Sequence, residues 1–385
     1  MIAFDGVTKC FHGGSVAVDS VDLTARAGET LVLVGPSGCG KTTSLRMINR
    51  LIEPTSGRIL LDGKDVRKSD PALLRRGIGY VIQQAGLFPH RTIEDNIGTV
   101  PVLLGWRRSR ARARAAELME LVGLTPDLAS RYPHQLSGGQ QQRVGVARAL
   151  AADPPVLLMD EPFSAVDPLV RASLQDELIK LQSKLHKTVV LVTHDIEEAI
   201  KLGDQVAIFR PGGKLAQMDP PERLLSSPAD DYVERFIGFD RGIRRLSFVG
   251  AEGLTLDREP VVAHDMSAAD ALTVAEQLTE PWLLVVDAQR RPLGWAAAAE
   301  LALAARDLPV GDMTLTRYGH TFAVRSDSLR AVLDATVLSS TGRAVGVDAD
   351  GRVAGVTSYE RLRAAIHDSS GCGSPQLAPG RAMPS

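Results

Sequence analysis

The stretch Gly-Pro-Ser-Gly-Cys-Gly-Lys-Thr-Thr at residues 35–43 decides the fold expected for this chain. It fits the pattern Gly-x-x-x-x-Gly-Lys-Ser/Thr, follows the apolar run Leu31–Val34 and precedes a predicted helix over Ser44–Leu51. In this strand–loop–helix setting, glycines let successive backbone N–H groups point at phosphate oxygens, at the positive end of a helix dipole. A glycine-rich turn that matches by chance is the alternative. The motif predicts a nucleoside triphosphate site formed by Gly35, Ser37, Gly38, Cys39, Gly40, Lys41, Thr42 and Thr43.

Three side chains of this loop have predicted properties of their own. Lys41 can reach the β- and γ-phosphates, and the hydroxyl of Thr42 can bind Mg²⁺. Cys39 lies inside the loop, so we expect alkylation of its thiol to block ATP binding.

A second candidate element is the apolar run Val-Leu-Leu-Met at 156–159, which ends in Asp160 and Glu161. A run this short and apolar predicts a buried strand. Acids at its end would lie at the carboxyl edge of a parallel sheet, where α/β folds bind ligands. Asp160 suits the outer shell of Mg²⁺, and Glu161 is placed to polarise a water molecule for attack on the γ-phosphate. Solvated loop acids after an ordinary strand are the alternative.

The run Leu-Ser-Gly-Gly-Gln at 136–140 opens a predicted helix over Gln140–Ala151. It offers backbone donors, a hydroxyl and a helix N-terminus, which together form a second anion-binding element. A flexible linker would be the alternative for Ser-Gly-Gly alone. With the phosphate loop before it and Asp-Glu-Pro after it, the chain resembles the ATP-binding-cassette (ABC) ATPases, whose hallmark is this pentapeptide. The resemblance covers roughly residues 1–238.

The resemblance implies an α/β fold, with a RecA-like core and a helical subdomain, that binds ATP and Mg²⁺. In that family two cassettes pair head to tail, so Ser137 and Gly139 would act on the nucleotide of a second copy. Asp167, in a Ser-Ala-Val-Asp run that departs from the usual Ser-Ala-Leu-Asp, would help to join the two active sites. Phe11 matches the aromatic residue that stacks on adenine.

Two further residues complete the catalytic set that the resemblance implies. Gln83 matches the glutamine that senses Mg²⁺ and the attacking water, so the implied metal residues are Thr42, Gln83 and Asp160. His194 follows a second predicted strand, Thr188–Val192, and matches the histidine that contacts the γ-phosphate. With Glu161 as the base, the implied mechanism is closure of the dimer on ATP, hydrolysis and reopening.

Composition limits the setting in which such an ATPase would work. The 385 residues carry a net charge of −2, which gives no pull toward nucleic acid, so we expect no nucleic-acid partner. No apolar run approaches the ~20 residues of a spanning helix, and the N-terminus lacks the features of a secretory signal. Three widely spaced cysteines form no disulfide or metal pattern. We expect a peripheral protein on the cytoplasmic face of the membrane.

The second half has a different organisation. Two similar units, Val261–Ala305 and Thr314–His367, each predict a helix, a strand, an Asp-containing turn, a second strand with glycine and another helix. This plan resembles a tandem pair of CBS domains, for which an unrelated α/β regulatory domain is the alternative. The predicted organisation is a cassette over 1–238, a linker with one or two strands over 239–259, a regulatory pair over 260–367 and a disordered tail over 368–385.

The wording Gln-Gln-Ala-Gly-Leu-Phe-Pro-His at 83–90 resembles importers of quaternary amines such as glycine betaine, carnitine and choline. Its apolar residues Leu87, Phe88 and Pro89 resemble the wall of the groove that accepts a permease. The resemblance implies a membrane permease and, through it, an extracytoplasmic substrate-binding protein as partners, with a regulatory ligand at the CBS pair. Aromatic residues make up only 4% of the chain, so the solute is expected to be recognised elsewhere. An importer of another small solute, such as an amino acid, and a soluble ABC ATPase outside transport are the alternatives.

Overall fold

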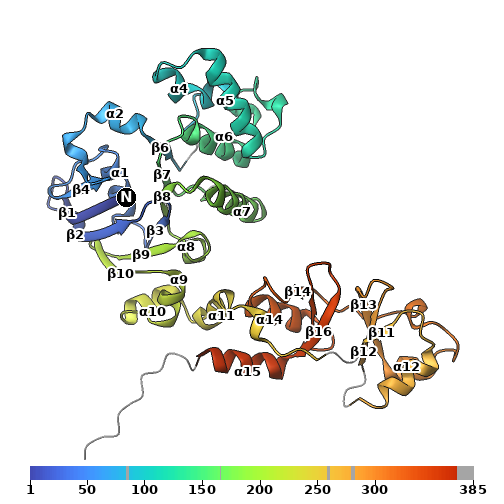
Figure 1. Ribbon diagram of the computed structural model, residues 1–385. Helices are drawn as coiled ribbons and strands as arrows, with labels where there is room; N and C mark the ends of the chain where they lie inside the picture. Colours follow the sequence, from blue (N-terminus) through green and yellow to red (C-terminus); the bar gives the residue numbers. More distant parts are fainter. Residues whose placement is uncertain (84–85, 165, 258–260, 279–281, 371–385) are drawn as a thin grey trace, which may run out of the picture. The chain divides into compact units, whose positions relative to one another are not determined.

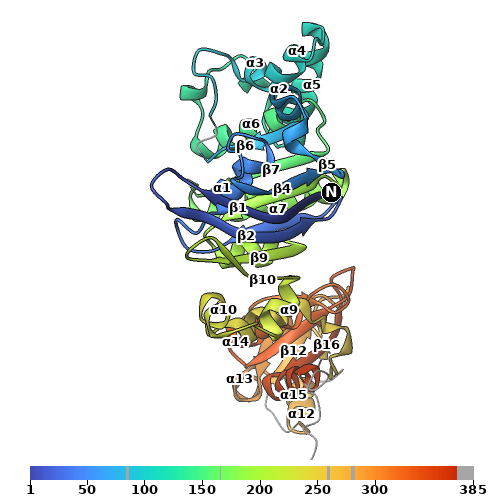
Figure 2. The same ribbon diagram turned by 90° about the vertical axis from the view of Figure 1, so that its left-hand side faces the viewer.

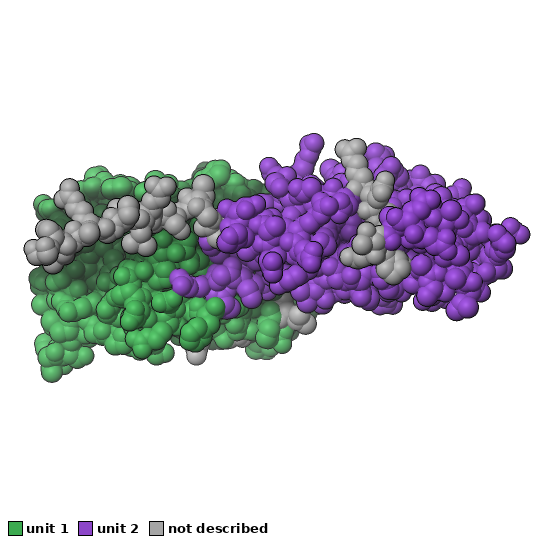
Figure 3. Space-filling model, turned by 90° about the horizontal axis from the view of Figure 1, so that it is seen from below, with its two compact units in different colours: residues 1–239 green, residues 240–385 purple. Residues whose placement is uncertain are grey.

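The computed structural model describes residues 1–83, 86–164, 166–257, 261–278 and 282–370. The chain divides into two compact units, Met1–Phe239 and a second unit that begins at Asp240 (Figure 3). Among the residues described, no helix is long and apolar enough to cross a membrane.

A six-stranded sheet forms the centre of the first unit, with the order β10-β9-β3-β8-β7-β6. All neighbours are parallel except β10, which pairs antiparallel with β9 at one edge. Every residue of β3, β7 and β8 is buried, as the unbroken apolar sequences of central parallel strands predict. The strands are β3 (Thr30–Val34), β6 (Ile78–Val81), β7 (Val156–Asp160), β8 (Thr188–Thr193), β9 (Gln205–Arg210) and β10 (Lys214–Asp219).

A second, antiparallel sheet lies beside the first (Figure 2). Apolar side chains of the two sheets share one core with the helix that follows the phosphate loop; Phe4, Leu33 and Leu45 are representative members. The sheet has the order β2-β1-β4-β5. Its strands are β1 (Ile2–Cys10), β2 (Val16–Ala25), β4 (Ser56–Leu61) and β5 (Lys64–Asp65).

Helices surround the central sheet, and a helical part lies between β6 and β7 in the sequence (Figure 1). That part contains α3 (Ile93–Ile97), α4 (Thr99–Leu103), α5 (Arg108–Leu121), α6 (Gly138–Leu150) and the short 3-10 helices Pro126–Leu128 and Pro133–Gln135. The other helices are α1 (Lys41–Ile48), α2 (Pro71–Arg76), α7 (Pro168–Leu185), α8 (Ile196–Leu202), α9 (Pro221–Ser226), α10 (Asp231–Ile237) and the 3-10 turn Val66–Lys68.

The second unit contains two repeats of the same order, strand–helix–strand–strand–helix. In each repeat the middle strand pairs parallel with a short first strand and antiparallel with the last. The first strands have three residues each, too few to show an alternating pattern, and the sequence prediction missed them. The repeats are β11 (Val261–Ala263), α12 (Ala268–Ala275), β12 (Trp282–Val286), β13 (Pro292–Ala297), α13 (Ala298–Leu303), then β14 (Thr321–Ala323), α14 (Leu329–Leu338), β15 (Arg343–Val347), β16 (Val353–Ser358), α15 (Tyr359–Ser370), with a 3-10 turn at Val310–Asp312.

The two repeats are interlocked. Asp257, which precedes the first repeat, bridges Val356 of the second, and Thr316, which precedes the second repeat, bridges Trp295 of the first. One apolar cluster spans both sheets, with Trp295 and Val356 among its buried members. Each repeat therefore depends on the other for part of its sheet and core.

The expected linker over 239–259 differs from its prediction. Its described part forms α11 (Arg241–Arg245) and the 3-10 helices Leu246–Phe248 and Ala251–Gly253, and the predicted strands are absent from residues 239–257. Apolar residues of this segment are buried in the core of the second repeat, where Leu246 and Ala251 pack beside Leu329. At the other end, α15 extends to Ser370, so the predicted tail begins as helix, and residues 371–385 lie outside the described part.

Candidate functional site

The phosphate loop joins the end of β3 to α1 and curls around its own lysine. Lys41 is 5% exposed, and its ammonium donates to the carbonyl oxygens of Gly35 at 2.7 Å and Pro36 at 2.9 Å. Gly40 has φ of +96°, and a Cβ at this position would lie 2.0 Å from the carbonyl oxygen of Ala17. Only glycine fits there, because β2 passes directly against the loop. Helix α1 begins at Lys41, three residues before its prediction.

Cys39 is buried in this loop, with 1% of its surface exposed and its sulfur 3.7 Å from the Lys41 ammonium. Burial raises the pKa of the thiol, against the lowering influence of the lysine. The expected block of ATP binding by alkylation therefore requires the loop to open first.

We expect alkylation of Cys39 by iodoacetamide to be at least about tenfold slower than alkylation of Cys10, because the thiolate is the reactive form and burial disfavours it. Cys10 is half-buried and serves as the internal reference. Because the pKa of Cys39 is raised, its rate should rise only at higher pH than that of an ordinary thiol. Peptide mass spectrometry over time, with and without MgATP, measures both rates. Equal rates for the two cysteines would contradict the burial of this loop.

The first acid of the Asp-Glu pair lies beside the phosphate loop. The hydroxyl of Thr42 donates to Oδ1 of Asp160 at 2.9 Å, and the Arg46 guanidinium lies 3.7 Å from Oδ2. Asp160 is 4% exposed, and burial raises the pKa of its carboxyl, while the Thr42 hydrogen bond opposes that rise. The contact follows from the strand order, since only β8 separates β7 from β3.

Three residues that were predicted to be catalytic meet at Glu161, the residue after Asp160. Gln83 donates its amide N–H to Oε2 of Glu161 at 3.1 Å, and Nδ1 of His194 lies 3.3 Å from the same oxygen. They follow β6, β7 and β8, three adjacent parallel strands, at one edge of the sheet. Glu161 has φ of +45°, a strained conformation for a residue other than glycine, and its N–H donates to Val192 at 3.0 Å.

The remaining predicted site residues lie elsewhere on the first unit. Ser137 caps α6 in a reciprocal pair of hydrogen bonds with Gln140, and Gly139 is in the first turn of that helix. Helix α6 packs beside β6, three strands from β3, which corresponds to roughly 14 Å across the sheet. Phe11, 43% exposed, lies between β1 and β2, and Asp167 is exposed directly before α7. Ser37 and Gly38 are exposed on the phosphate loop, and Thr43 is half-buried on α1.

Two charged side chains that lie around this site were not identified from the sequence. Arg46 is on α1, four residues after Thr42, and this helical spacing was the available signal for its approach to Asp160. Glu198 is a buried carboxylate on α8, four residues after His194, and nothing in the sequence distinguishes it from the exposed Glu197 beside it.

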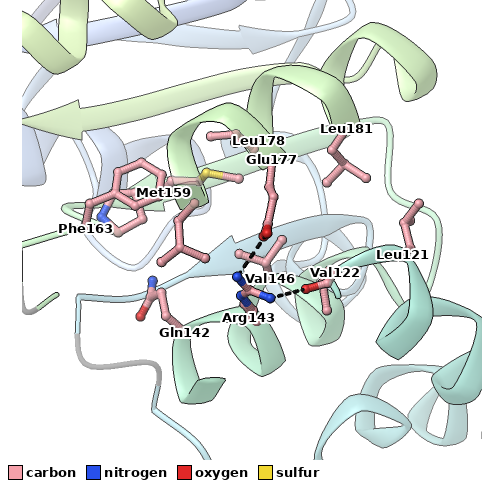
Figure 4. A pocket seen from close by; sticks show the side chains of 12 residues that line it. Leu121, Val122, Gln142, Arg143, Val146, Met159, Phe163, Glu177, Leu178 and Leu181 are labelled. Carbon is pink, nitrogen blue, oxygen red and sulfur yellow. Dashed lines mark hydrogen bonds and ion pairs between the residues drawn. The ribbon is translucent and has the colours of Figure 1, made fainter. Parts of the chain in front are cut away.

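Helix α6 is tied to α7 beside an apolar pocket (Figure 4). The guanidinium of Arg143 on α6 lies 2.9 Å from a carboxylate oxygen of Glu177 on α7 and donates to the carbonyl oxygen of Gly123 at 3.0 Å. The pocket has a volume of about 40 Å³, and Met159 and Phe163, on either side of the Asp-Glu pair, contribute to its wall. The helix that begins after Ser137 is thereby linked to β7, which ends in Asp160, and to α7, which follows Asp167.

Comparison with known proteins gives the same assignment as this geometry. Residues 18–164 match the family model described as ABC transporter. The choline transport ATP-binding protein OpuBA of Bacillus subtilis (strain 168) is 43% identical over 98% of this chain and 99% of its own length. The osmoprotectant import ATP-binding protein OsmV of Salmonella typhimurium is 46% identical over 94% of this chain and 95% of its own.

A solved structure supports the fold of the first unit. It is a dimeric, post-hydrolysis state of an ATP-binding cassette bound to ADP and Pi, 35% identical, with a TM-score of 0.52 over 57% of this chain and 99% of the other. The chain therefore belongs to the ATP-binding subunits of ABC transporters, and it is an ATPase.

Proposed function

We propose that this chain is the ATP-hydrolysing subunit of an importer for glycine betaine or a related quaternary amine. The observation that carries the proposal is that similarity to the choline transport protein extends over 98% of this chain and 99% of that relative. The family model covers only residues 18–164, within the first unit, and does not by itself separate this function from the alternatives. The similarity to the choline transport protein includes the second unit, and this unit therefore favours an importer of quaternary amines over the alternatives.

The proposed chemistry assigns separate tasks to the residues at the edge of the sheet. Lys41 would leave the carbonyl oxygens of Gly35 and Pro36 to contact the phosphates of ATP. Glu161 would accept a proton from the attacking water, while His194 contacts the γ-phosphate. Gln83 would orient the same water, since its amide already contacts the Glu161 carboxylate at 3.1 Å.

The oxygen atoms at this edge also fit Mg²⁺, which prefers hard oxygen ligands. The Thr42 hydroxyl and Asp160 carboxylate are 2.9 Å apart, and the Gln83 amide uses its nitrogen toward Glu161, which leaves its oxygen for the metal. When bound, the ion would neutralise charge that develops on the phosphates. The chain's own contribution is to hold these oxygens together, on α1 and at the ends of the adjacent strands β6 and β7.

A second copy of the chain would complete the site. Ser137 and Gly139 are at the N-terminal end of α6, which packs beside β6, three strands from the strand that precedes the phosphate loop of their own chain. In a head-to-tail pair, the N-terminus of α6 would bind the γ-phosphate held by the partner, and Asp167 would contact the partner's site. Phe11 would stack on adenine, with the Lys9 ammonium 5.3 Å from its ring. The dimeric form of the similar solved cassette supports this arrangement.

A hollow of about 460 Å³ on the helical part is the proposed docking site for the permease. Phe88 (40%), Val102 (44%) and Leu103 (59%) are exposed along it. The buried Asn96 holds its wall, because its amide donates to the carbonyl oxygens of Phe88, Arg91 and Thr92. Phe88 is five positions after Gln83 in the sequence, so docking would take place close along the chain to the nucleotide site.

We expect Leu103→Asp to reduce the amount of permease that co-purifies with the tagged chain from detergent-solubilised membranes by at least about tenfold, since a charge would be desolvated in an apolar contact. Leu73→Asp on α2 is the matched control, because Leu73 is similarly exposed at 64% but lies outside the hollow. ATP binding by both variants should equal that of the wild type. If no membrane protein co-purifies with the wild-type chain, the result would instead support a soluble ABC ATPase outside transport.

The interlocked repeats of the second unit would form a tandem CBS pair that modulates the ATPase. In nucleotide-binding CBS domains, Thr or Ser and an Asp three residues later commonly contact the ligand. Here the first position is Ala296 or Thr357, each 1% exposed, and the Asp position that would hold the ribose is Ala299 or Glu360, so neither repeat has the full pair. The proposed regulatory ligand would therefore bind elsewhere on the pair. With a permease as partner, the chain would lie peripherally on the cytoplasmic face of the membrane.

A further inference from the structure

Glu198 is a buried carboxylate for which the proposed ATPase chemistry has no role. It is on α8 and is 5% exposed. Its Oε2 accepts a hydrogen bond from the Thr193 hydroxyl at 2.6 Å, and its Oε1 accepts one from the Gln175 amide at 3.2 Å. A buried carboxylate is costly unless donors compensate its charge, and here each oxygen has one.

The first donor belongs to the residue next to His194. Thr193 ends β8, and its hydroxyl oxygen also accepts the N–H of Asp195 at 3.0 Å. Asp195 in turn caps α8, where its carboxylate accepts the N–H of Glu197 at 2.8 Å. The backbone on both sides of His194 is therefore fixed, while its side chain stays exposed at 56% and lies 3.3 Å from Glu161.

The second donor belongs to α7, the helix that starts directly after Asp167. Gln175 and Glu177 are two positions apart, about 200° around the helix, so they lie on nearly opposite faces. Gln175 contacts Glu198 on α8, whereas Glu177 pairs with Arg143 on α6 (Figure 4). Helix α7 thus connects the helix that follows Ser137 with the strand end that carries His194.

We propose that Glu198 is a positioning residue for ATP hydrolysis, which holds His194 in its contact with Glu161 and makes that position depend on α7. Movement of α7 would reach Glu198 through Gln175 and then Thr193. Because Asp167 precedes α7, contact with a second copy would be transmitted to the histidine by the same route. This role rests on the functions proposed above for Glu161 and His194 in ATP hydrolysis, and it holds whichever solute is transported.

The test is steady-state and single-turnover ATPase kinetics of the full chain with Glu198→Ala. We expect kcat to fall about tenfold with KM for ATP changed less than about twofold, as for loss of one hydrogen bond to a charged group. Glu198→Gln should recover most of the loss, because its amide oxygen can still accept from Thr193. Glu197→Ala on the same helix is the control and should keep the wild-type rate, since Glu197 is exposed.

Two comparisons separate positioning from simple structural support. In a His194→Ala background, Glu198→Ala should lower the single-turnover rate no further, because its effect passes through the histidine. If Glu198→Ala does not fold, Thr193→Val and Thr193→Ser can be compared instead. Valine removes the hydroxyl that donates to Glu198 and serine keeps it, so only Thr193→Val should have a lower kcat. An unchanged kcat in Glu198→Ala, or an effect of the same size with and without His194, would overturn the proposal.

Discussion

Glu161→Gln should abolish ATP turnover while ATP remains bound. The amide keeps the size of the side chain but cannot accept the proton of the attacking water, so we expect kcat to fall by about 10²–10⁴-fold. The contacts expected of Lys41 and Thr42 with the nucleotide would be unaffected, so the affinity for ATP should change less than about threefold. Because hydrolysis would reset the closed pair, the variant should accumulate as an ATP-bound dimer. Phosphate release and light scattering with ATP measure the two effects.

The matched control for this variant is Glu197→Gln, which removes a carboxylate from the exposed face of α8. It should hydrolyse ATP at the wild-type rate and show no ATP-dependent gain in mass. Turnover of Glu161→Gln within about threefold of the wild type would mean that another group accepts the proton.

Gly40→Ala is expected to destroy ATP binding through a single methyl group. Its Cβ would lie 2.0 Å from the carbonyl oxygen of Ala17 and 3.2 Å from a methyl group of Val18, so the loop and β2 cannot both keep their positions. We expect the affinity for ATP to fall at least about a hundredfold, because misplaced backbone donors lose their contacts with the phosphates. Isothermal titration calorimetry measures the affinity.

Gly63→Ala is the control for the steric clash, because it measures only the loss of stability when alanine adopts a positive φ. Gly63 has φ of +77° in the turn between β4 and β5, and a Cβ there would meet nothing within 4 Å. This control should lose about 1–2 kcal/mol of unfolding free energy and bind ATP as the wild type does. Equal stability and equal ATP affinity in the two variants would show that β2 does not press against the phosphate loop.

The strands and helices around the proposed nucleotide site were predictable because burial and capping each require a recognisable run of residues. The strands that end before Gly35 and Glu161 are continuous apolar runs, and Ser137 forms the capping box that starts α6. The resemblance then indicated which side chains belong together. The structure brings Gln83, Glu161 and His194 to one place, as parallel strands in the order β8-β7-β6 require.

Other features depend on contacts between distant residues, and sequence patterns do not show them. The three-residue strands β11 and β14 exist because longer neighbours pair with them, and alone they have no periodicity. The segment around Leu246 was expected to contain strands but packs as short helical turns in a core that α14 and α15 complete. Burial of Glu198 likewise depends on Gln175, which is 23 positions away.

If ATP hydrolysis by this chain drives the import of a quaternary amine, uptake of radiolabelled glycine betaine, choline and carnitine should depend on its catalytic base. Cells that lack the chain should regain uptake of at least one of these solutes when the wild-type chain is supplied, and not when Glu161→Gln is supplied at the same level. Restored uptake of a labelled amino acid alone, or uptake of the amines that is equal with the two forms, would contradict this function.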